Sequence, residues 1–128
     1  MNKAPLVTPH AIFEIKDDIL YVIYPPGTII TLEAAKDIVK QRLAYTNNVP
    51  YRLVVSGEGL RAVDKEARSY LSKEGAEGVM AGVLLVNSIY TEFFGNFFLN
   101  ISKPLNPAKL FTDKEKALEW LEQFKSKS

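Results

Sequence analysis

The residues whose types and spacing come closest to a chemical site lie near the middle of the chain. Ser56-Gly57-Glu58-Gly59 is a glycine-rich segment, and the basic residues Arg61, Lys65 and Arg68 follow it. Ligands of open α/β sheets often bind beyond the carboxyl ends of the strands, where basic side chains can meet an anionic group. The segment matches neither GxGxxG nor GxxxxGK[ST], so a phosphate cradle is only weakly indicated. A strand-to-helix connector followed by a solvated helix face explains the same residues.

The rest of the chain offers little equipment for covalent or metal chemistry. There is no cysteine, which excludes disulfides, thiolate catalysis and cysteine-based metal centres. The single histidine, His10, lies in a proline-flanked N-terminal segment, which is a poor platform for the general base of a catalytic triad. The acidic pair Asp17-Asp18 is better interpreted as a turn than as a cation site. We therefore expect no enzymatic activity, no bound metal and no cofactor.

The composition is that of one ordinary soluble domain. The chain has 128 residues, of which 47% are hydrophobic and 24% charged, and its net charge is +1. This balance provides no electrostatic footprint for nucleic acid. The longest apolar run, 79–86, is much shorter than the roughly 20 residues of a membrane span. We expect a single cytoplasmic domain over 1–128, with an N-terminal arm at 1–10 and a polar tail at 125–128.

Strands and helices are expected to alternate along most of the chain. The sequence predicts a hairpin formed by residues 11–16 and 19–24. It also predicts buried strands at 53–55 and 79–86. Thr31 is the expected N-cap of a helix that runs to about Tyr45, and Thr112 to Glu115 matches a capping box. The remaining predicted elements are a loop at 56–62, helices at 64–75, 88–102 and 112–124, and a short edge strand at 109–111. The order strand-strand-helix-strand-helix-strand-helix-strand-helix predicts an α/β fold with one mixed sheet.

The predicted helix at 88–102 carries an unusual density of aromatic residues. These are Tyr90, Phe93, Phe94, Phe97 and Phe98. Their apolar arc is wider than a helix on one side of a sheet usually needs, so the excess surface would have to be covered. Core packing, self-association between copies of the chain, and contact with an apolar ligand or a membrane all explain this pattern.

Several segments together resemble a known family. They are Thr31–Lys36, Lys65–Tyr70, Gly95–Leu99, Leu110–Asp113 and Ala117–Leu121. The chain from about Phe13 to Phe124 is similar to small uncharacterised bacterial proteins of the SpoIIAA-like, or STAS, group, which includes anti-sigma factor antagonists. This resemblance implies a mixed β-sheet with helices packed on it, related in fold to Sec14-type domains.

The resemblance also implies a function. It implies a regulatory domain that binds a protein partner, itself unknown. Because no catalytic set can be assembled from the residues, we expect this domain to be non-enzymatic, and we expect it to form a homodimer. The antagonists meet their partners at the loop after the central strand and at the start of the next helix, which here correspond to Ser56, Gly57, Glu58, Gly59, Arg61, Asp64, Lys65 and Arg68. Their phosphorylatable serine has no counterpart, because the matching stretch 62–67 contains no hydroxyl residue. The alternative function is binding of an apolar or lipid-like ligand through the aromatic helix 88–102.

Overall fold

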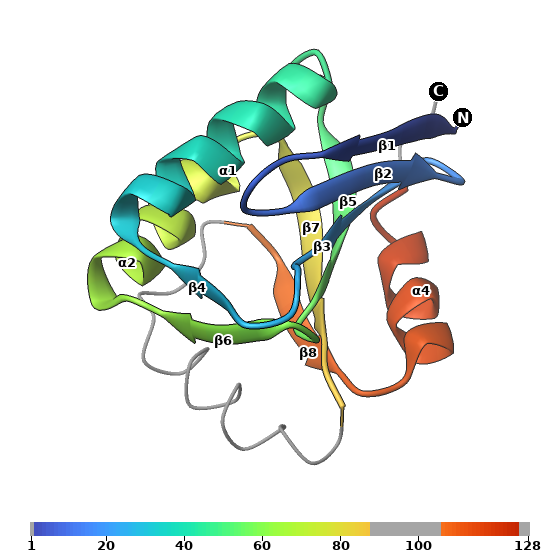
Figure 1. Cartoon of the computed structure of the whole chain (residues 1–128). Helices are drawn as coiled ribbons and strands as arrows, with labels where there is room; N and C mark the ends of the chain where they lie inside the picture. The colour runs from blue at the N-terminus through green and yellow to red at the C-terminus, as the bar shows by residue number, and fades with distance from the viewer. Residues whose placement is uncertain (1, 88–105, 126–128) are drawn as a thin grey trace.

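A six-stranded mixed sheet forms the centre of the molecule (Figure 1). The computed structural model describes residues 2–87 and 106–125. The sheet order is β1-β2-β3-β5-β7-β8, and its strands are β1 (Lys3–Val7), β2 (Ile12–Lys16), β3 (Ile19–Ile23), β5 (Tyr51–Ser56), β7 (Val79–Leu85) and β8 (Ala108–Phe111). A separate two-stranded sheet pairs β4 (Thr28–Ile30) with β6 (Leu60–Val63). The described helices are α1 (Leu32–Tyr45), α2 (Lys65–Lys73), the 3₁₀ helix η1 (Glu74–Ala76) and α4 (Lys114–Glu122).

The direction of the strands divides the large sheet into two parts. β1, β2 and β3 pair in antiparallel fashion, whereas β3, β5, β7 and β8 are parallel. Parallel neighbours need crossover connections, and α1 and α2 lie in those that join β3 to β5 and β5 to β7. These two helices cover one face of the sheet, while α4 covers the other (Figure 1). The predicted mixed α/β fold is confirmed.

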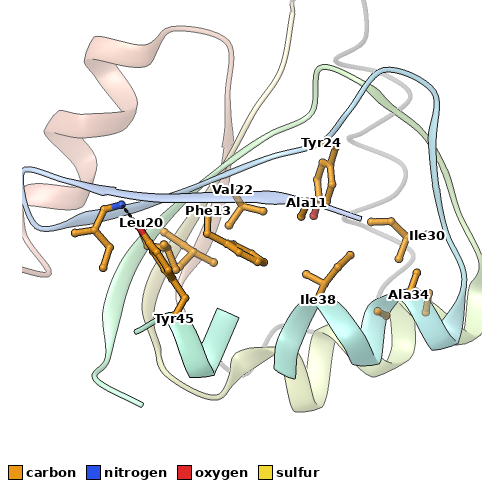
Figure 2. Packing of buried hydrophobic residues seen from close by; sticks show 13 residues of the cluster. Ala11, Phe13, Leu20, Val22, Tyr24, Ile30, Ala34, Ile38 and Tyr45 are labelled. Atoms are coloured by element: carbon orange, nitrogen blue, oxygen red, sulfur yellow. Dashed lines mark hydrogen bonds between the residues drawn. The ribbon is translucent and has the colours of Figure 1, made fainter. Parts of the chain in front are cut away.

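Two apolar cores lie on opposite faces of the sheet. In the larger one, Figure 2 shows the side chains of Phe13, in β2, and Tyr24, directly after β3, directed toward Ile38 of α1. In the smaller one, Ala117 and Leu121 of α4 pack against the sheet. Because β5 and β7 are covered on both faces, their sequences read as continuous apolar runs. The buried strands predicted at 53–55 and 79–86 are therefore confirmed.

Local sequence signals determine where the elements begin and turn. The Thr31 side chain accepts a hydrogen bond from the Ala34 amide (3.2 Å) and caps α1, as predicted. Asp17 and Asp18 both adopt positive φ, 53° and 64°, as a two-residue hairpin turn requires. The hairpin predicted between residues 11–16 and 19–24 is confirmed by the pairing of β2 with β3.

The cap of α4 differs by one residue from the predicted capping box. The N-cap is Asp113 rather than Thr112, and its carboxylate accepts hydrogen bonds from the amides of Glu115 (2.9 Å) and Lys116 (3.2 Å). A carboxylate can satisfy two of the free amides of the first turn, and its charge is favourable at a helix N-terminus. These two advantages explain why the helix begins after the aspartate.

The predicted N-terminal arm at 1–10 is wrong, because Lys3–Val7 forms the edge strand β1. Leu6 pairs with Phe13 of β2, and a turn at Thr8 to Ala11 connects the two strands. The Tyr45 hydroxyl lies 2.8 Å from the carbonyl oxygen of Ala4 and accepts a hydrogen bond from an amide of β2. This anchor on α1 lies far away in the sequence, so the N-terminal residues alone did not reveal the strand.

The predicted loop at 56–62 is also partly wrong, because β6 begins at Leu60. Its partner β4 was not predicted as a strand at all. Both strands have four residues or fewer, which is too short for a periodic apolar pattern to appear. Together they form a small second sheet next to the start of α2.

Replacing Tyr45 with phenylalanine tests the role of this anchor. The variant keeps the ring, which lies 6.2 Å from the Phe13 ring, but it loses the hydroxyl that joins α1 to β1 and β2. We expect the free energy of unfolding to fall by about 1–2 kcal/mol, because a partly buried hydrogen-bond network is lost. Urea unfolding measures this loss, and hydrogen exchange should show faster opening of the β1 amides.

Tyr70→Phe, a half-buried tyrosine of α2, is the matched control and should change stability by less than about 0.5 kcal/mol. Equal losses in the two variants, or unchanged protection of β1, would contradict the anchoring role of Tyr45.

Candidate functional site

The glycine-rich segment lies at the carboxyl end of β5 and is held firmly by backbone hydrogen bonds. The Gly57 amide donates to the Leu85 carbonyl (2.8 Å), and the Leu60 amide donates to the Gly57 carbonyl (3.1 Å). The Gly59 carbonyl accepts a hydrogen bond from the Thr28 amide (2.9 Å). A phosphate cradle needs free amides, and the amide of Gly57 and that of Leu60, which follows the segment, already have partners. The segment therefore acts as a fixed joint between the two sheets.

Gly59 is required at this joint for two reasons. Its φ is +88°, a conformation that side chains with a Cβ disfavour. A Cβ on this residue would also lie 2.3 Å from the backbone carbonyl oxygen of Tyr24. The glycine thus allows the connector to pass directly against the end of β3.

The predicted partner-binding residues lie along one continuous stretch of this region. Glu58, Arg61, Asp64 and Lys65 are exposed, and Ser56 is half-buried at the end of β5. The Asp64 amide donates to the Ile30 carbonyl (2.9 Å), which attaches the start of α2 to the small sheet. The structure brings these residues together on the loop, on β6 and on the first turn of α2.

The small sheet has an inner and an outer side. Ile30 is buried and pairs with Val63, whereas Ile29 is 48% exposed and pairs with Ala62. Arg61 is exposed at the irregularity between the two strands. We call Ile29, Ala62 and Arg61, together with Glu58 and Lys65, the small-sheet surface. Its large apolar side chain, Ile29, was not predicted from the sequence, because β4 was not predicted.

At the start of α2, the side chains of Asp64 and Arg68 differ in how they contact their own chain. Asp64 occupies the N-cap, yet its side chain makes no capping hydrogen bond. Arg68, half-buried one turn later, points a guanidinium nitrogen toward the Val63 carbonyl (3.5 Å). It is therefore partly engaged with its own chain.

The predicted aromatic surface, Tyr90, Phe93, Phe94, Phe97 and Phe98, lies outside the described residues, and so does the predicted helix at 88–102. The polar tail predicted at 125–128 is described only at Lys125, which is exposed. His10 is half-buried near the turn between β1 and β2. Within residues 2–87 and 106–125, no three His, Cys, Asp or Glu side chains gather as metal ligands would. No helix in that part of the chain has the length and apolarity of a membrane span.

The structure reveals a cavity that the sequence did not indicate. It has a volume of about 220 Å³ and lies between the larger sheet, the small sheet and helices α1 and α2. Most of its walls are valine, leucine and isoleucine side chains, and its polar side chains among the described residues are Tyr24, Arg42 and Ser72. Ser72 is already engaged, because its hydroxyl donates to the Ser69 carbonyl (2.9 Å).

Arg42 is the buried cation of this cavity. Its side chain is 3% exposed, and Nη2 donates to the carbonyl oxygen of Gly75 (3.0 Å). Burial lowers the pKa of the guanidinium, while the negative charge of exposed Glu77 opposes this shift. The one available sequence signal was its position: Arg42 lies four residues after Ile38 and three after Val39, on the apolar side of α1.

Tyr24 is the second polar group of the cavity, and it is 8% exposed. Burial raises its pKa to about 12, with the positive charge of Arg42 acting in the opposite direction. The phenol is therefore neutral at physiological pH, able to donate one hydrogen bond and accept others. Among the described residues the Tyr24 hydroxyl has no hydrogen-bond partner. Every fully buried polar side-chain atom in that part of the chain does have a partner. The Tyr24 oxygen is therefore not fully buried and borders open space.

Comparisons with known proteins establish the fold and the family without indicating a function. A solved structure of an uncharacterized protein of the DUF3478 family with a SpoIIAA-like fold, from Shewanella loihica PV-4, has a TM-score of 0.59 and 15% sequence identity. The similarity covers 91% of this chain and 98% of that one, and it confirms the predicted SpoIIAA-like fold. No curated protein sequence matches. A family model described as a domain of unknown function (DUF7793) matches residues 13–125.

Gly59→Ala tests whether the glycine-rich joint is structural. The added Cβ meets backbone rather than a flexible side chain, so we expect a loss of about 3 kcal/mol or more in the free energy of unfolding. Gly27→Ala is the matched control, because Gly27 has a similar φ of +80° but no atom within 4 Å of its Cβ position. That variant should lose only about 1 kcal/mol from backbone strain. Similar losses in chemical denaturation would show that close packing at Gly59 is unimportant.

Proposed function

This chain belongs to the DUF7793 family, a domain of unknown function, and we propose that it is a non-enzymatic regulatory domain that binds a protein partner. The proposed contact region is the small-sheet surface with the adjoining residues 56–59, Asp64 and Arg68. The observation that carries the proposal is the exposed Ile29, an apolar side chain of β4, whose partner strand β6 carries the exposed Arg61. The setting that we propose is the bacterial cytoplasm.

The composition of the small-sheet surface fits the anatomy of a protein interface. Interfaces usually combine an apolar centre with a polar and charged rim. Here Ile29 and half-buried Ala62 form the apolar part, and Glu58, Arg61 and Lys65 supply charges of both signs. Such a mixed rim favours a protein partner with complementary charges over a uniformly charged polymer.

The rigidity of the surface also supports the proposal. Its strands are joined to each other and to the large sheet through hydrogen bonds at Thr28, Gly57 and Asp64. A surface that is already ordered loses little conformational entropy when a partner binds. The resemblance to anti-sigma factor antagonists points to the same region of the fold.

Ile29→Asp tests this proposal directly. A carboxylate at the apolar centre should weaken partner binding by at least tenfold, because it would be buried without a counter-charge. The measurement is affinity purification with the full chain from cells of its own source, followed by a titration of the purified partner. Arg61→Glu, which reverses a charge in the proposed rim, should also weaken binding and make it less sensitive to salt.

The matched control is Val49→Asp, since Val49 is equally exposed (50%) but follows α1, outside the small-sheet surface. The proposal fails if Val49→Asp weakens partner binding as much as Ile29→Asp does. It also fails if neither substitution changes the affinity for a confirmed partner.

We also propose that the chain forms a homodimer, supported by the aromatic density of residues 90–98. Sedimentation equilibrium should show a dimer for the wild type and a dissociation constant raised at least tenfold in Phe98→Glu, because a carboxylate would enter the apolar contact. Circular dichroism serves as the control for folding. A monomeric wild type would contradict the dimer, and an unfolded Phe98→Glu variant would assign Phe98 to the core instead.

A further inference from the structure

We propose that the cavity between α1, α2 and the large sheet binds a small apolar carboxylic acid, whose carboxylate contacts Arg42 and Tyr24. The cavity touches the inner side of the small sheet at Ile30 and Val63, but none of the five residues of the small-sheet surface lines it, and the proposal does not depend on the proposed protein partner. The proposal rests on three features: a buried cation, a buried hydroxyl that borders open space, and apolar walls around both.

The charge of Arg42 determines the polarity of the ligand. A buried guanidinium is costly unless it is paired, and Arg42 uses one hydrogen bond to the neutral carbonyl of Gly75. Within the described part of the chain, no ion pair joins it to a carboxylate. A guanidinium has five donors in a planar fork, a geometry that matches a carboxylate with two parallel hydrogen bonds. An anionic group is therefore the ligand head that complements this side chain.

Tyr24 adds a second donor to the same site. It comes from the end of β3, and Figure 2 shows its ring directed into the space between the sheet and α1. The residue is more than nine-tenths buried, and its hydroxyl lacks a partner among the described residues. Because the phenol stays neutral at physiological pH, it can donate a hydrogen bond to an anion without electrostatic repulsion.

The walls and the volume determine the rest of the ligand. Leu53, Val55, Leu60 and Val63 are among the aliphatic side chains that line the cavity, so the body of the ligand should be hydrocarbon. A dry cavity of about 150 Å³ accepts benzene, with six carbon atoms. By that scale about 220 Å³ accommodates about nine non-hydrogen atoms. This size corresponds to a medium-chain or simple aromatic acid.

Octanoate is a suitable probe, and 1-octanol is its uncharged analogue. The full chain is titrated with each compound, and binding is measured by isothermal titration calorimetry and by methyl NMR of the cavity residues. Octanoate should bind more tightly than 1-octanol. Arg42→Met should lower the affinity for octanoate at least tenfold and change the affinity for 1-octanol by less than twofold. The substitution removes the cation but retains an apolar side chain. Tyr24→Phe should weaken octanoate severalfold.

The matched control is Arg52→Met. Arg52 is also a buried arginine (5% exposed) with one hydrogen bond to a carbonyl, that of Leu121, but it lies on the α4 face and does not line the cavity. The Arg52→Met variant should bind octanoate with the same affinity as the wild type. If Arg42→Met does not fold, Tyr24→Phe and the octanoate-to-octanol ratio still decide the question.

Three results would overturn the proposal. They are the absence of octanoate binding at millimolar concentration, equal binding of octanoate and 1-octanol by the wild type, and an equal loss of octanoate affinity in Arg42→Met and Arg52→Met. None of these results bears on Ile29 or on the protein partner, so the proposed function is tested separately.

Discussion

Burial of the parallel strands on both faces is the constraint on which the rest of the structure depends. β5 and β7 can lie at the centre only if apolar layers cover them from both directions. Helices α1 and α2 provide one layer and α4 provides the other. The covering is continuous around Ala117 and Leu121, but on the opposite face it leaves a space at Tyr24 and Arg42. The core of the molecule and its cavity thus both result from how the helices cover the two faces of the sheet.

The sequence predicted elements whose signals are local and failed where the signal lies elsewhere in the chain. The caps, the Asp17-Asp18 turn and the apolar runs of β5 and β7 act within a few residues, so their elements were predicted correctly. β1 depends on pairing with β2 and on Tyr45, which lies about forty residues later, and neither leaves a local trace. β4 and β6 are short and stabilise each other across the chain.

The candidate sites show the same division. The partner-binding residues were predicted from a resemblance, and the structure places them in the loop after β5, on β6 and in the first turns of α2. Their apolar neighbour Ile29 became visible only with the small sheet. The polar groups of the cavity come from the residue after β3, from α1 and from α2, so only the folded chain brings them together. The position of Arg42 on the apolar side of α1 was the one sequence signal from which this site could have been predicted.

The outer strands of the large sheet limit how two copies of this chain can associate. β1 is an edge strand, and its third residue is Pro5, which lacks an amide hydrogen and interrupts the row of donors that an added strand would need. Lysine side chains on β1 and β8 place a charge at each margin. Intermolecular strand addition, and the fibrous aggregation that follows from it, is therefore discouraged at both margins. Any self-association of this domain should proceed through side-chain packing instead.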